Sequence, residues 1–364
     1  MGILIADGNC DPVVGAVSAF HHPVGIKERH GRCADQFIHR IHIRLHQKIG
    51  VLQVLSADVY PEAIQREDTF TIETRIIDVQ NDPAFGDYGR LLFPVNSGYM
   101  SGDTLGSLRL TWYNNIDPDK TVEICNYMRD HAETGDTIFY DIYTEEEKKA
   151  DSAKRDTGLF FFNGDPGKKF AVVNAGGGFA YVGAMHDSFP HALELSKMGY
   201  NAFALIYRPG AQTACEDLAR AIAFIFEHAE ELQVDTSDYS LWGGSAGARM
   251  ANWVGTFGTE SFGEYVYPHP AAVIVNYTGL SEVTGDEPPT YSAVGTNDGI
   301  ASYRTMERRI SEIRENGTNA EIEVFHGLSH GFGLGTGTAA EGWIERAVEF
   351  WKQNMKNAGG GYRP

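Results

Sequence analysis

Hydrophobic residues after about residue 135 follow two patterns in turn. Short apolar runs bounded by Gly, Asn or Asp are typical of buried strands, and the longer segments between them repeat apolar residues at helical spacing. In residues 214–232, for example, Leu218, Ile222 and Ile225 fall on one helical face. Strands are expected at residues 137–143, 158–163, 169–174, 202–207, 239–243, 271–277, 290–297 and 321–325, and helices at residues 188–198, 214–232, 303–316, 340–356 and from residue 246 onward.

This alternation of strands and helices is typical of an α/β fold. We therefore expect a mostly parallel central sheet with helices on both faces. The chain of 364 residues is long enough to bury a large core. A change in composition divides it into an N-terminal extension, residues 1–80, and a main domain, residues 81–364.

The N-terminal extension differs from the main domain in charge and periodicity. Residues 1–50 hold six of the thirteen His and carry six Lys+Arg against four Asp+Glu, whereas the whole chain has a net charge of −19. Polar and apolar residues alternate in residues 40–46 and again in residues 68–76, which predicts strands. We therefore expect a β-rich extension. It has three open interpretations: an arm that pairs two chains as a homodimer, a cap over a site in the main domain, or a segment that the main domain does not need.

Neither a metal nor an organic cofactor is expected. Strand alternation places His39 on the opposite face from His42 and His46, which separates the candidate ligands. The four Cys are scattered without a C-x-x-C pair, so free buried thiols are expected. A G-x-G-x-x-A run at residues 335–340 does not directly follow a strand, which argues against a dinucleotide site.

The most informative motif joins the strand at residues 239–243 to the helix that follows it. The run from Gly243 to Gly247 fits G-x-S-x-G in the strand–turn–helix context of a nucleophile elbow. Small residues flank the Ser because the strand and the helix approach closely at so sharp a turn, and the hydroxyl then stands at the start of a helix. Ser245 is therefore the candidate nucleophile.

A glycine run after the strand at residues 169–174 supplies a candidate oxyanion hole. A tetrahedral oxyanion needs backbone N–H donors, and glycine lets the main chain present them without obstruction by side chains. The expected donors are Gly177, Gly178 and the amide of Ala246, the residue after the nucleophile. A phosphate loop is disfavoured because the run lacks the pattern G-x-x-x-x-G-K-[ST].

The ends of the last two predicted strands carry a candidate acid and a candidate base. Asp298 ends one strand, where a carboxylate can orient a histidine. His330 lies in the Gly-rich loop after the other strand and can reach over the strand ends, whereas His326 lies closer to its strand and is interpreted as a loop residue. The chain order Ser245, Asp298, His330 is that of α/β-hydrolases rather than of chymotrypsin or subtilisin.

From about residue 81 to residue 355 the chain resembles the α/β-hydrolase superfamily. Within it, the chain is similar to the acetyl esterase/lipase group, which includes hormone-sensitive-lipase-like and feruloyl/acetyl-xylan esterases. Ala175 stands where hormone-sensitive-lipase-like enzymes usually have His, which moves the resemblance toward carbohydrate-ester and short-chain esterases. The resemblance implies cleavage of a carboxylic ester with a small acyl group through an acyl-enzyme, without a cofactor. The matching runs are residues 175–179, 243–247, 295–298 and 330–332.

The spacing of the triad bears on substrate access. Ser245 and Asp298 are 53 residues apart, which leaves no room for the helical lid of many lipases. An open site suits a small acyl group on a bulky alcohol, such as an acetylated sugar. Phe179, His186 and Tyr207 are candidates to line the pocket, with structural roles as the alternative for each.

Charge and hydropathy exclude other classes of partner. The net charge of −19 disfavours nucleic acid and anionic membranes, and no apolar run approaches the roughly 20 residues of a membrane helix. The N-terminus lacks the basic region and the apolar core of a signal peptide. Because esterases of this group are often exported, the compartment stays open, with the cytoplasm as the default.

The expected activity is that of a serine carboxylesterase acting on a small-molecule or carbohydrate ester. Two alternatives stay open. A serine peptidase of the same fold is disfavoured because no propeller-blade repeats are visible. A non-catalytic binding module on the fold is disfavoured because all three triad residues are present.

Overall fold

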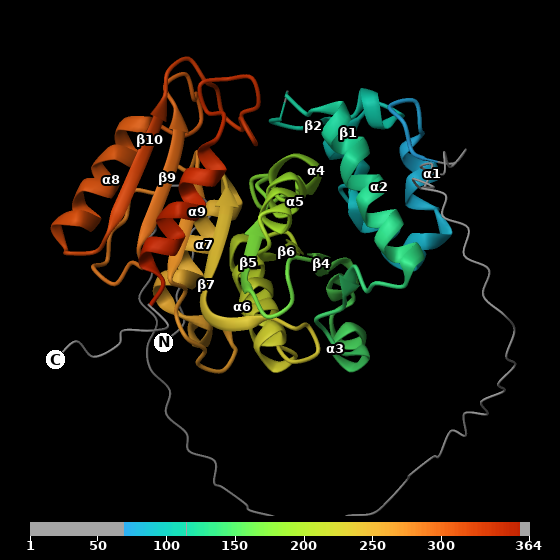
Figure 1. Ribbon diagram of the computed structural model, residues 1–364, viewed down its shortest axis with the longest axis horizontal. Coiled ribbons are helices and arrows are strands. Elements are labelled where there is room, and N and C mark those ends of the chain that lie inside the picture. Colours follow the sequence, from blue (N-terminus) through green and yellow to red (C-terminus); the bar gives the residue numbers. More distant parts are fainter. Residues whose placement is uncertain (1–68, 114, 357–364) are drawn as a thin grey trace, which may run out of the picture. The chain divides into compact units, whose positions relative to one another are not determined.

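The computed structural model describes residues 69–113 and 115–356, and these form one compact unit around an eight-stranded sheet (Figure 1). The strand order is β10-β9-β8-β7-β5-β6-β4-β3. Strands β10 to β6 pair in parallel, and β4 and β3 pair antiparallel at one edge, so the prediction of a mostly parallel sheet is confirmed. The strands are β3 (Phe139–Tyr140), β4 (Gly158–Phe162), β5 (Lys169–Asn174), β6 (Asn201–Ile206), β7 (Asp235–Gly244), β8 (Ala272–Asn276), β9 (Thr290–Gly295) and β10 (Ala320–Phe325).

Helices cover both faces of this sheet. On one face, α6 packs beside α7, and Arg309 of α8 donates a hydrogen bond to Asn252 of α7 over 2.7 Å between Nη2 and Oδ1. On the other face, Trp343 of α9 contacts His191 of α5 with ring centroids 5.4 Å apart. The helices are α2 (Pro118–Thr134), α3 (Glu145–Ala150), α4 (Ala184–Asp187), α5 (Phe189–Lys197), α6 (Ala211–Glu227), α7 (Ala246–Phe257), α8 (Tyr303–Glu315) and α9 (Trp343–Asn354).

Local sequence sets where the longer helices begin and end. Asp117 caps α2, because its Oδ1 accepts the backbone N–H groups of Asp119 and Lys120 at 3.0 and 3.2 Å. Pro118 occupies the first helical position, where no N–H partner is needed, and Gly135 ends the helix at φ +94°. The helix predicted after the elbow and the one predicted at residues 303–316 are both present, as α7 and α8.

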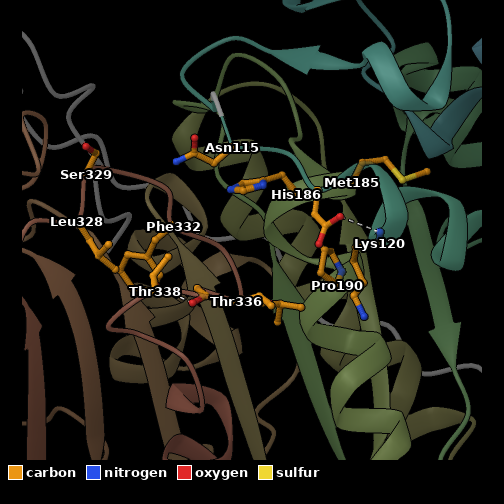
Figure 2. Close-up of a pocket in the computed structure, with 13 residues that line it drawn as sticks. Asn115, Lys120, Met185, His186, Pro190, Leu328, Ser329, Phe332, Thr336 and Thr338 are labelled. Carbon is orange, nitrogen blue, oxygen red and sulfur yellow. Dashed lines mark hydrogen bonds between the residues drawn. The ribbon is translucent and has the colours of Figure 1, made fainter. Parts of the chain in front are cut away.

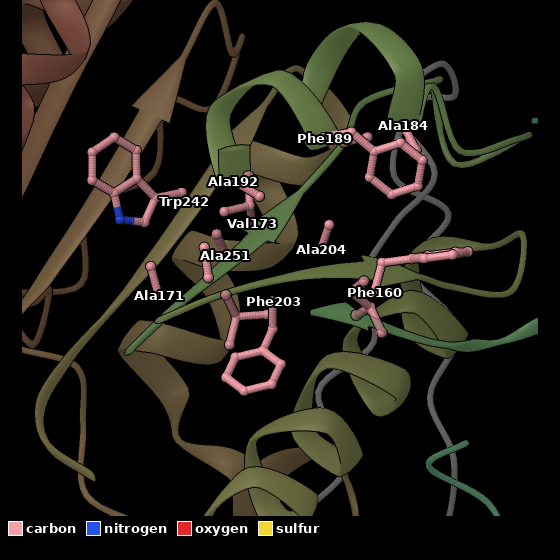
Figure 3. Close-up of a cluster of buried hydrophobic side chains, with 14 of the residues drawn as sticks. Phe160, Ala171, Val173, Ala184, Phe189, Ala192, Phe203, Ala204, Trp242 and Ala251 are labelled. Carbon is pink, nitrogen blue, oxygen red and sulfur yellow. The ribbon is translucent and has the colours of Figure 1, made fainter. Parts of the chain in front are cut away.

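The core fills the space between the central strands and the helices on each face (Figure 3). Strands β4, β5 and β6 are buried along almost their whole length, because helices cover the sheet on both faces. Phe161 and Phe203 stack with their centroids 4.4 Å apart across the β4–β6 pair. The rings of Trp242 and Trp343, with centroids 6.2 Å apart, pack β7 against α9.

The segment before α2 is helical and irregular rather than rich in strands. Residues 69–71 are irregular, residues 72–74 form a turn, and α1 (Ile76–Gln80) begins at the last residue of the strand predicted at residues 68–76, so the described part of that prediction is wrong. Polar and apolar residues alternate there because Phe70, just before the turn, packs into the core. Its backbone N–H donates to Asn126 Oδ1 at 2.9 Å and holds it in place. The remaining elements are η1 (Pro83–Leu92), η2 (Ser97–Tyr99), β1 (Met100–Ser101), η3 (Leu105–Ser107), β2 (Arg109–Leu110), η4 (Ser152–Asp156) and η5 (Thr259–Phe262).

Residues 69–80 therefore pack with the main domain, and the compact unit begins before the predicted boundary at residue 80. The strand predicted at residues 40–46, the histidine-rich segment and the homodimer arm lie outside the described residues.

The backbone is closely packed where α7 leaves the sheet. A Cβ on Gly247 would overlap the backbone oxygens of Asn174 and Ala175, and a Cβ on Gly243 would overlap the backbone of Gly247. Helix α7 and strands β5 and β7 approach this closely only because both residues lack a side chain.

We predict that Gly247→Ala lowers the free energy of unfolding by at least about 2 kcal/mol, because the added methyl group must push α7 away from β5. Gly299→Ala is the matched control, since nothing lies within 4 Å of its Cβ position. Urea unfolding followed by circular dichroism measures both variants. Equal stabilities for the two would contradict the packing argument.

Candidate active site

Ser245 lies on the turn between β7 and α7 in a strained conformation. Its backbone has φ +52° and ψ −116°, which a residue with a side chain rarely adopts. Two backbone hydrogen bonds hold it there: Ser245 N–H donates to Asn276 O at 3.0 Å, and Arg249 N–H donates to Ser245 O at 3.3 Å. The turn is thus fixed to β8 on one side and to the first turn of α7 on the other.

The structure brings the three predicted triad residues together. His330 Nε2 lies 3.0 Å from Ser245 Oγ, and His330 Nδ1 lies 2.9 Å from Asp298 Oδ2. Because a carboxylate only accepts hydrogen bonds, Nδ1 of His330 carries the proton and Nε2 is free to accept from the Ser245 hydroxyl. His326 is exposed in the turn that directly follows β10.

Asp298 is buried and fixed from behind. Its side chain is fully inaccessible, and its Oδ1 accepts the backbone N–H groups of Ile300 at 2.8 Å and Ala301 at 2.7 Å. The second oxygen is therefore the one that faces His330. The serine follows β7, the acid follows β9 and the histidine follows β10, all at the carboxyl edge of one parallel sheet.

The chain has an α/β-hydrolase fold. The topology, the elbow and the order of the three residues together give this assignment, which the sequence motifs had predicted.

The oxyanion loop, the name used for the predicted donor loop at residues 175–178, follows β5 and runs beside Ser245. Gly177 has φ +130° and Gly178 has φ +62°, backbone conformations that side chains disfavour. A Cβ on Gly176 would lie 2.8 Å from Ser245 Cβ, so the loop passes directly by the nucleophile. Among residues 69–113 and 115–356, no acceptor takes the amides of Gly177, Gly178 or Ala246, which leaves these N–H groups for a ligand.

The three predicted pocket residues have firm structural contacts. Tyr207 is buried and donates from its hydroxyl to Ala175 O at 2.6 Å, which fixes the start of the oxyanion loop. Phe179 stacks on Trp253 with centroids 6.1 Å apart. His186 is buried, and its Nε2 lies 2.7 Å from Gly331 O, one residue beyond His330. Since a carbonyl only accepts, Nε2 of His186 must be the donor.

A pocket of about 340 Å³ opens beside the loop that carries His330 (Figure 2). His186, Met185 and Pro190 form one wall, and Phe332 and Thr336 lie on the other. Asp117 and Lys120, at the start of α2, also line the pocket. Two loops that are distant in sequence therefore meet at this pocket, and the His186–Gly331 hydrogen bond joins them.

Sequence reasoning missed three residues of the site. Tyr113 lies against both the oxyanion loop and the loop that carries His330, since a Cβ on Gly176 would overlap its hydroxyl oxygen and a Cβ on Gly331 would lie 2.6 Å from its ring. Trp112 is 48% exposed with φ +70°, and its ring lies against Gly178, where a Cβ would meet Cζ3 at 2.9 Å. Asp187 is fully buried behind Gly176. Of the three, only Asp187 lies beside a predicted site residue, His186.

Comparison with known proteins agrees with this assignment. Residues 164–304 match the BD-FAE family model, an α/β-hydrolase-like esterase family. This match supports hydrolase activity. No curated protein matches the chain.

Several solved structures are similar to this chain at low identity. Esterase 2 of Thermogutta terrifontis, phosphonylated by cyclosarin, is 22% identical over 54% of this chain and 89% of its own, with a TM-score of 0.48. The propionate-bound form of the same esterase is 20% identical over 56% of this chain and 92% of its own, with a TM-score of 0.49. An acetyl ester-xyloside bifunctional hydrolase from Caldicellulosiruptor lactoaceticus is 21% identical over 54% of this chain and 88% of its own, with a TM-score of 0.48.

The described residues offer neither a cluster of metal ligands nor a membrane-spanning helix. Residues 69–113 and 115–356 contain no group of three or more His, Cys, Asp or Glu side chains arranged to hold a metal ion. In the same part of the chain, every helix is too short or too polar to cross a bilayer.

The burial of His186 predicts a pH dependence of stability. Burial lowers the pKa of His186 below its usual range, although the nearby Asp187 charge opposes this, so the folded state holds the imidazole neutral. Below pH ~6.5 the unfolded chain takes up a proton that the folded chain does not, so stability falls as the pH falls, by at most about 1.4 kcal/mol per pH unit from this group.

His186→Gln keeps an N–H donor for Gly331 O and removes the titration. We expect its free energy of unfolding to fall less steeply than that of the wild type between pH 7.5 and pH 5.5, as measured by urea unfolding. All other titrating groups are common to both proteins. Identical slopes would show that His186 is not held neutral.

Proposed function

We propose that this α/β-hydrolase is a serine carboxylesterase that cleaves short-chain, acetyl-type esters through an acyl-enzyme. The observation that carries the proposal is the continuous hydrogen-bonded chain from Ser245 Oγ through His330 to Asp298. The BD-FAE match supports carboxylic ester hydrolysis as the reaction class.

In the first half-reaction, Ser245 Oγ attacks the ester carbonyl carbon while His330 Nε2 takes the hydroxyl proton. The carbonyl π electrons move to oxygen, and this oxyanion is stabilised by the free amides of Gly177, Gly178 and Ala246. Asp298 stabilises the imidazolium that forms. Collapse of the intermediate breaks the bond to the alcohol oxygen, and His330 returns the proton to that oxygen.

In the second half-reaction, water attacks the acyl-enzyme, with His330 as the base. The same oxyanion donors serve again, and Ser245 leaves with the proton from His330. The carboxylic acid is released. Each proton that moves passes through His330 Nε2, so one histidine serves both half-reactions.

The surroundings of Ser245 support a small acyl group on a ring-bearing alcohol. Between Ser245 and Asp298 the chain forms α7, η5, β8 and β9, and these described elements include no helical lid. The exposed face of Trp112 lies beside Gly178, at the edge of the oxyanion loop. Its ring is backed by Tyr181, with centroids 5.9 Å apart, and Tyr181 is backed in turn by Tyr99 at 4.8 Å. Such a fixed aromatic face suits the flat side of a sugar or phenyl ring.

Hydrolysis of a p-nitrophenyl ester series from acetate to palmitate tests the proposed reaction. We expect kcat/KM to fall steeply beyond butyrate, and Ser245→Ala to lose at least about 10⁴-fold in kcat, because the attacking oxygen is gone. Strong activity on long chains would contradict the short-acyl proposal. Absence of all ester hydrolysis in folded wild-type protein, or full activity in Ser245→Ala, would overturn the proposed function.

Trp112→Ala tests the proposed alcohol side. We expect KM for phenyl acetate and for acetylated xylobiose to rise about 2- to 10-fold, the range of a lost aromatic contact, with KM for ethyl acetate unchanged. Tyr265→Ala is the control, since Tyr265 is an aromatic residue that is 79% exposed. It precedes the amino end of β8, whereas the site lies at the carboxyl ends of the strands. A uniform effect of Trp112→Ala on all three esters would contradict ring stacking.

A further inference from the structure

The dipeptide His186–Asp187 of α4 contacts two loops of the proposed catalytic machinery, the oxyanion loop and the loop that carries His330. Asp187 Oδ2 accepts the backbone N–H of Gly176 in the oxyanion loop at 2.7 Å. His186 Nε2 donates to Gly331 O in the loop that carries His330 at 2.7 Å. Adjacent side chains of one short helix thus hold the two loops whose separation fixes where an oxyanion and a base can act on one carbonyl.

Two buried tyrosines extend the contacts of Asp187. Tyr113 donates its hydroxyl to Asp187 Oδ2 at 2.9 Å, and Tyr277 donates its hydroxyl to Asp187 Oδ1. The backbone amide of Gly333 also approaches the Tyr277 hydroxyl. Tyr277 therefore links Asp187 to the His330 loop a second time, and its ring lies 5.2 Å from the His330 ring.

The elbow itself packs on the same carboxylate. A Cβ on Gly244 would overlap both oxygens of Asp187, so the backbone just before Ser245 rests directly on this side chain. Asp187 is fully inaccessible to solvent, and every polar contact that it makes is to a donor. A carboxylate fits this position because both of its oxygens accept, whereas an Asn would turn an N–H group toward a donor.

We propose that His186 and Asp187 form a positioning clamp that sets the oxyanion amides and His330 in register with Ser245. This inference rests on the proposed ester hydrolysis and adds residues that act through the triad and the oxyanion loop without touching substrate. Asp187 turns the Gly176 N–H inward, which leaves the next amides, those of Gly177 and Gly178, to face the substrate. The clamp therefore acts on the transition state more than on ground-state binding.

Tyr277→Phe is the main test, because it removes one hydroxyl and keeps the ring beside His330. We expect kcat for p-nitrophenyl acetate to fall about 10- to 100-fold, less than the loss on deleting an oxyanion donor outright, while KM stays within about twofold. The inhibition constant of a trifluoromethyl ketone, which forms a tetrahedral oxyanion adduct on Ser245, is expected to rise by the same factor as kcat falls.

Tyr239→Phe is the matched control. It also deletes a buried tyrosine hydroxyl, which donates to Pro268 O at 2.9 Å from the middle of β7, six residues before Ser245. Thermal unfolding of both variants separates loss of register from loss of stability. Asp187→Asn and Tyr113→Phe are expected to show the same split between kcat and KM, and Tyr277→Phe carries the test alone if Asp187→Asn does not fold.

A wild-type kcat in Tyr277→Phe, or a lower kcat with an unchanged ketone inhibition constant, would overturn the clamp while leaving the esterase function intact. Failure of the proposed function has a different signature, because the wild-type protein itself would then hydrolyse no ester, and the clamp would fall with it. Equal kinetic losses in Tyr277→Phe and Tyr239→Phe would also overturn it, since they would show only a general effect of a lost buried hydroxyl.

Discussion

The strained backbone of Ser245 is the constraint on which the rest of the site depends. At φ +52° the residue projects its hydroxyl from the end of β7 toward the other strand ends, and the strain persists only because packing on both sides leaves no alternative. Gly243 and Gly247 make that packing possible, since α7 lies against the end of β5 with no space for a methyl group. The same approach brings the start of α7, and with it the Ala246 amide, beside the oxyanion loop.

The loops around Ser245 gain their order from groups buried below them rather than from contacts with solvent-facing residues. Tyr207 holds the carbonyl of Ala175, Asp187 holds the amide of Gly176, and His186 holds the carbonyl of Gly331. Each is a hydrogen bond between a buried side chain and the backbone of a loop. A glycine-rich loop is flexible by itself, so such bonds are needed to select the one conformation that presents free amides.

The sequence was sufficient for the strands from β4 onward and for the longer helices from α5 onward, because each depends on local pattern. Strand β5 matches its predicted range, and the Gly-x-Ser-x-Gly run needs close neighbours on either side of Ser245. Asp298 and His330 followed from the shared edge of parallel strands. Tyr113 and Trp112 could not be predicted in this way, since their positions depend on a long irregular segment that crosses from β2 to α2. The strand expected at residues 68–76 failed for a related reason: Phe70 and Ile76 are buried from an irregular segment and a helix, and burial alone produced the alternation.

The two buried carboxylates of the site have different roles because their partners differ. In the proposed mechanism, Asp298 faces an imidazole that becomes positively charged during each half-reaction, so its charge interacts most strongly in the transition state. Asp187 faces only an amide and two tyrosine hydroxyls, and burial together with the Asp187 charge raises the pKa of both tyrosines well above their usual range, so these partners stay neutral. A bare negative charge behind an oxyanion hole would oppose the developing oxyanion. Three donors that share the charge of Asp187 reduce that opposition, and the carboxylate can then serve as a fixed point for the loop backbone.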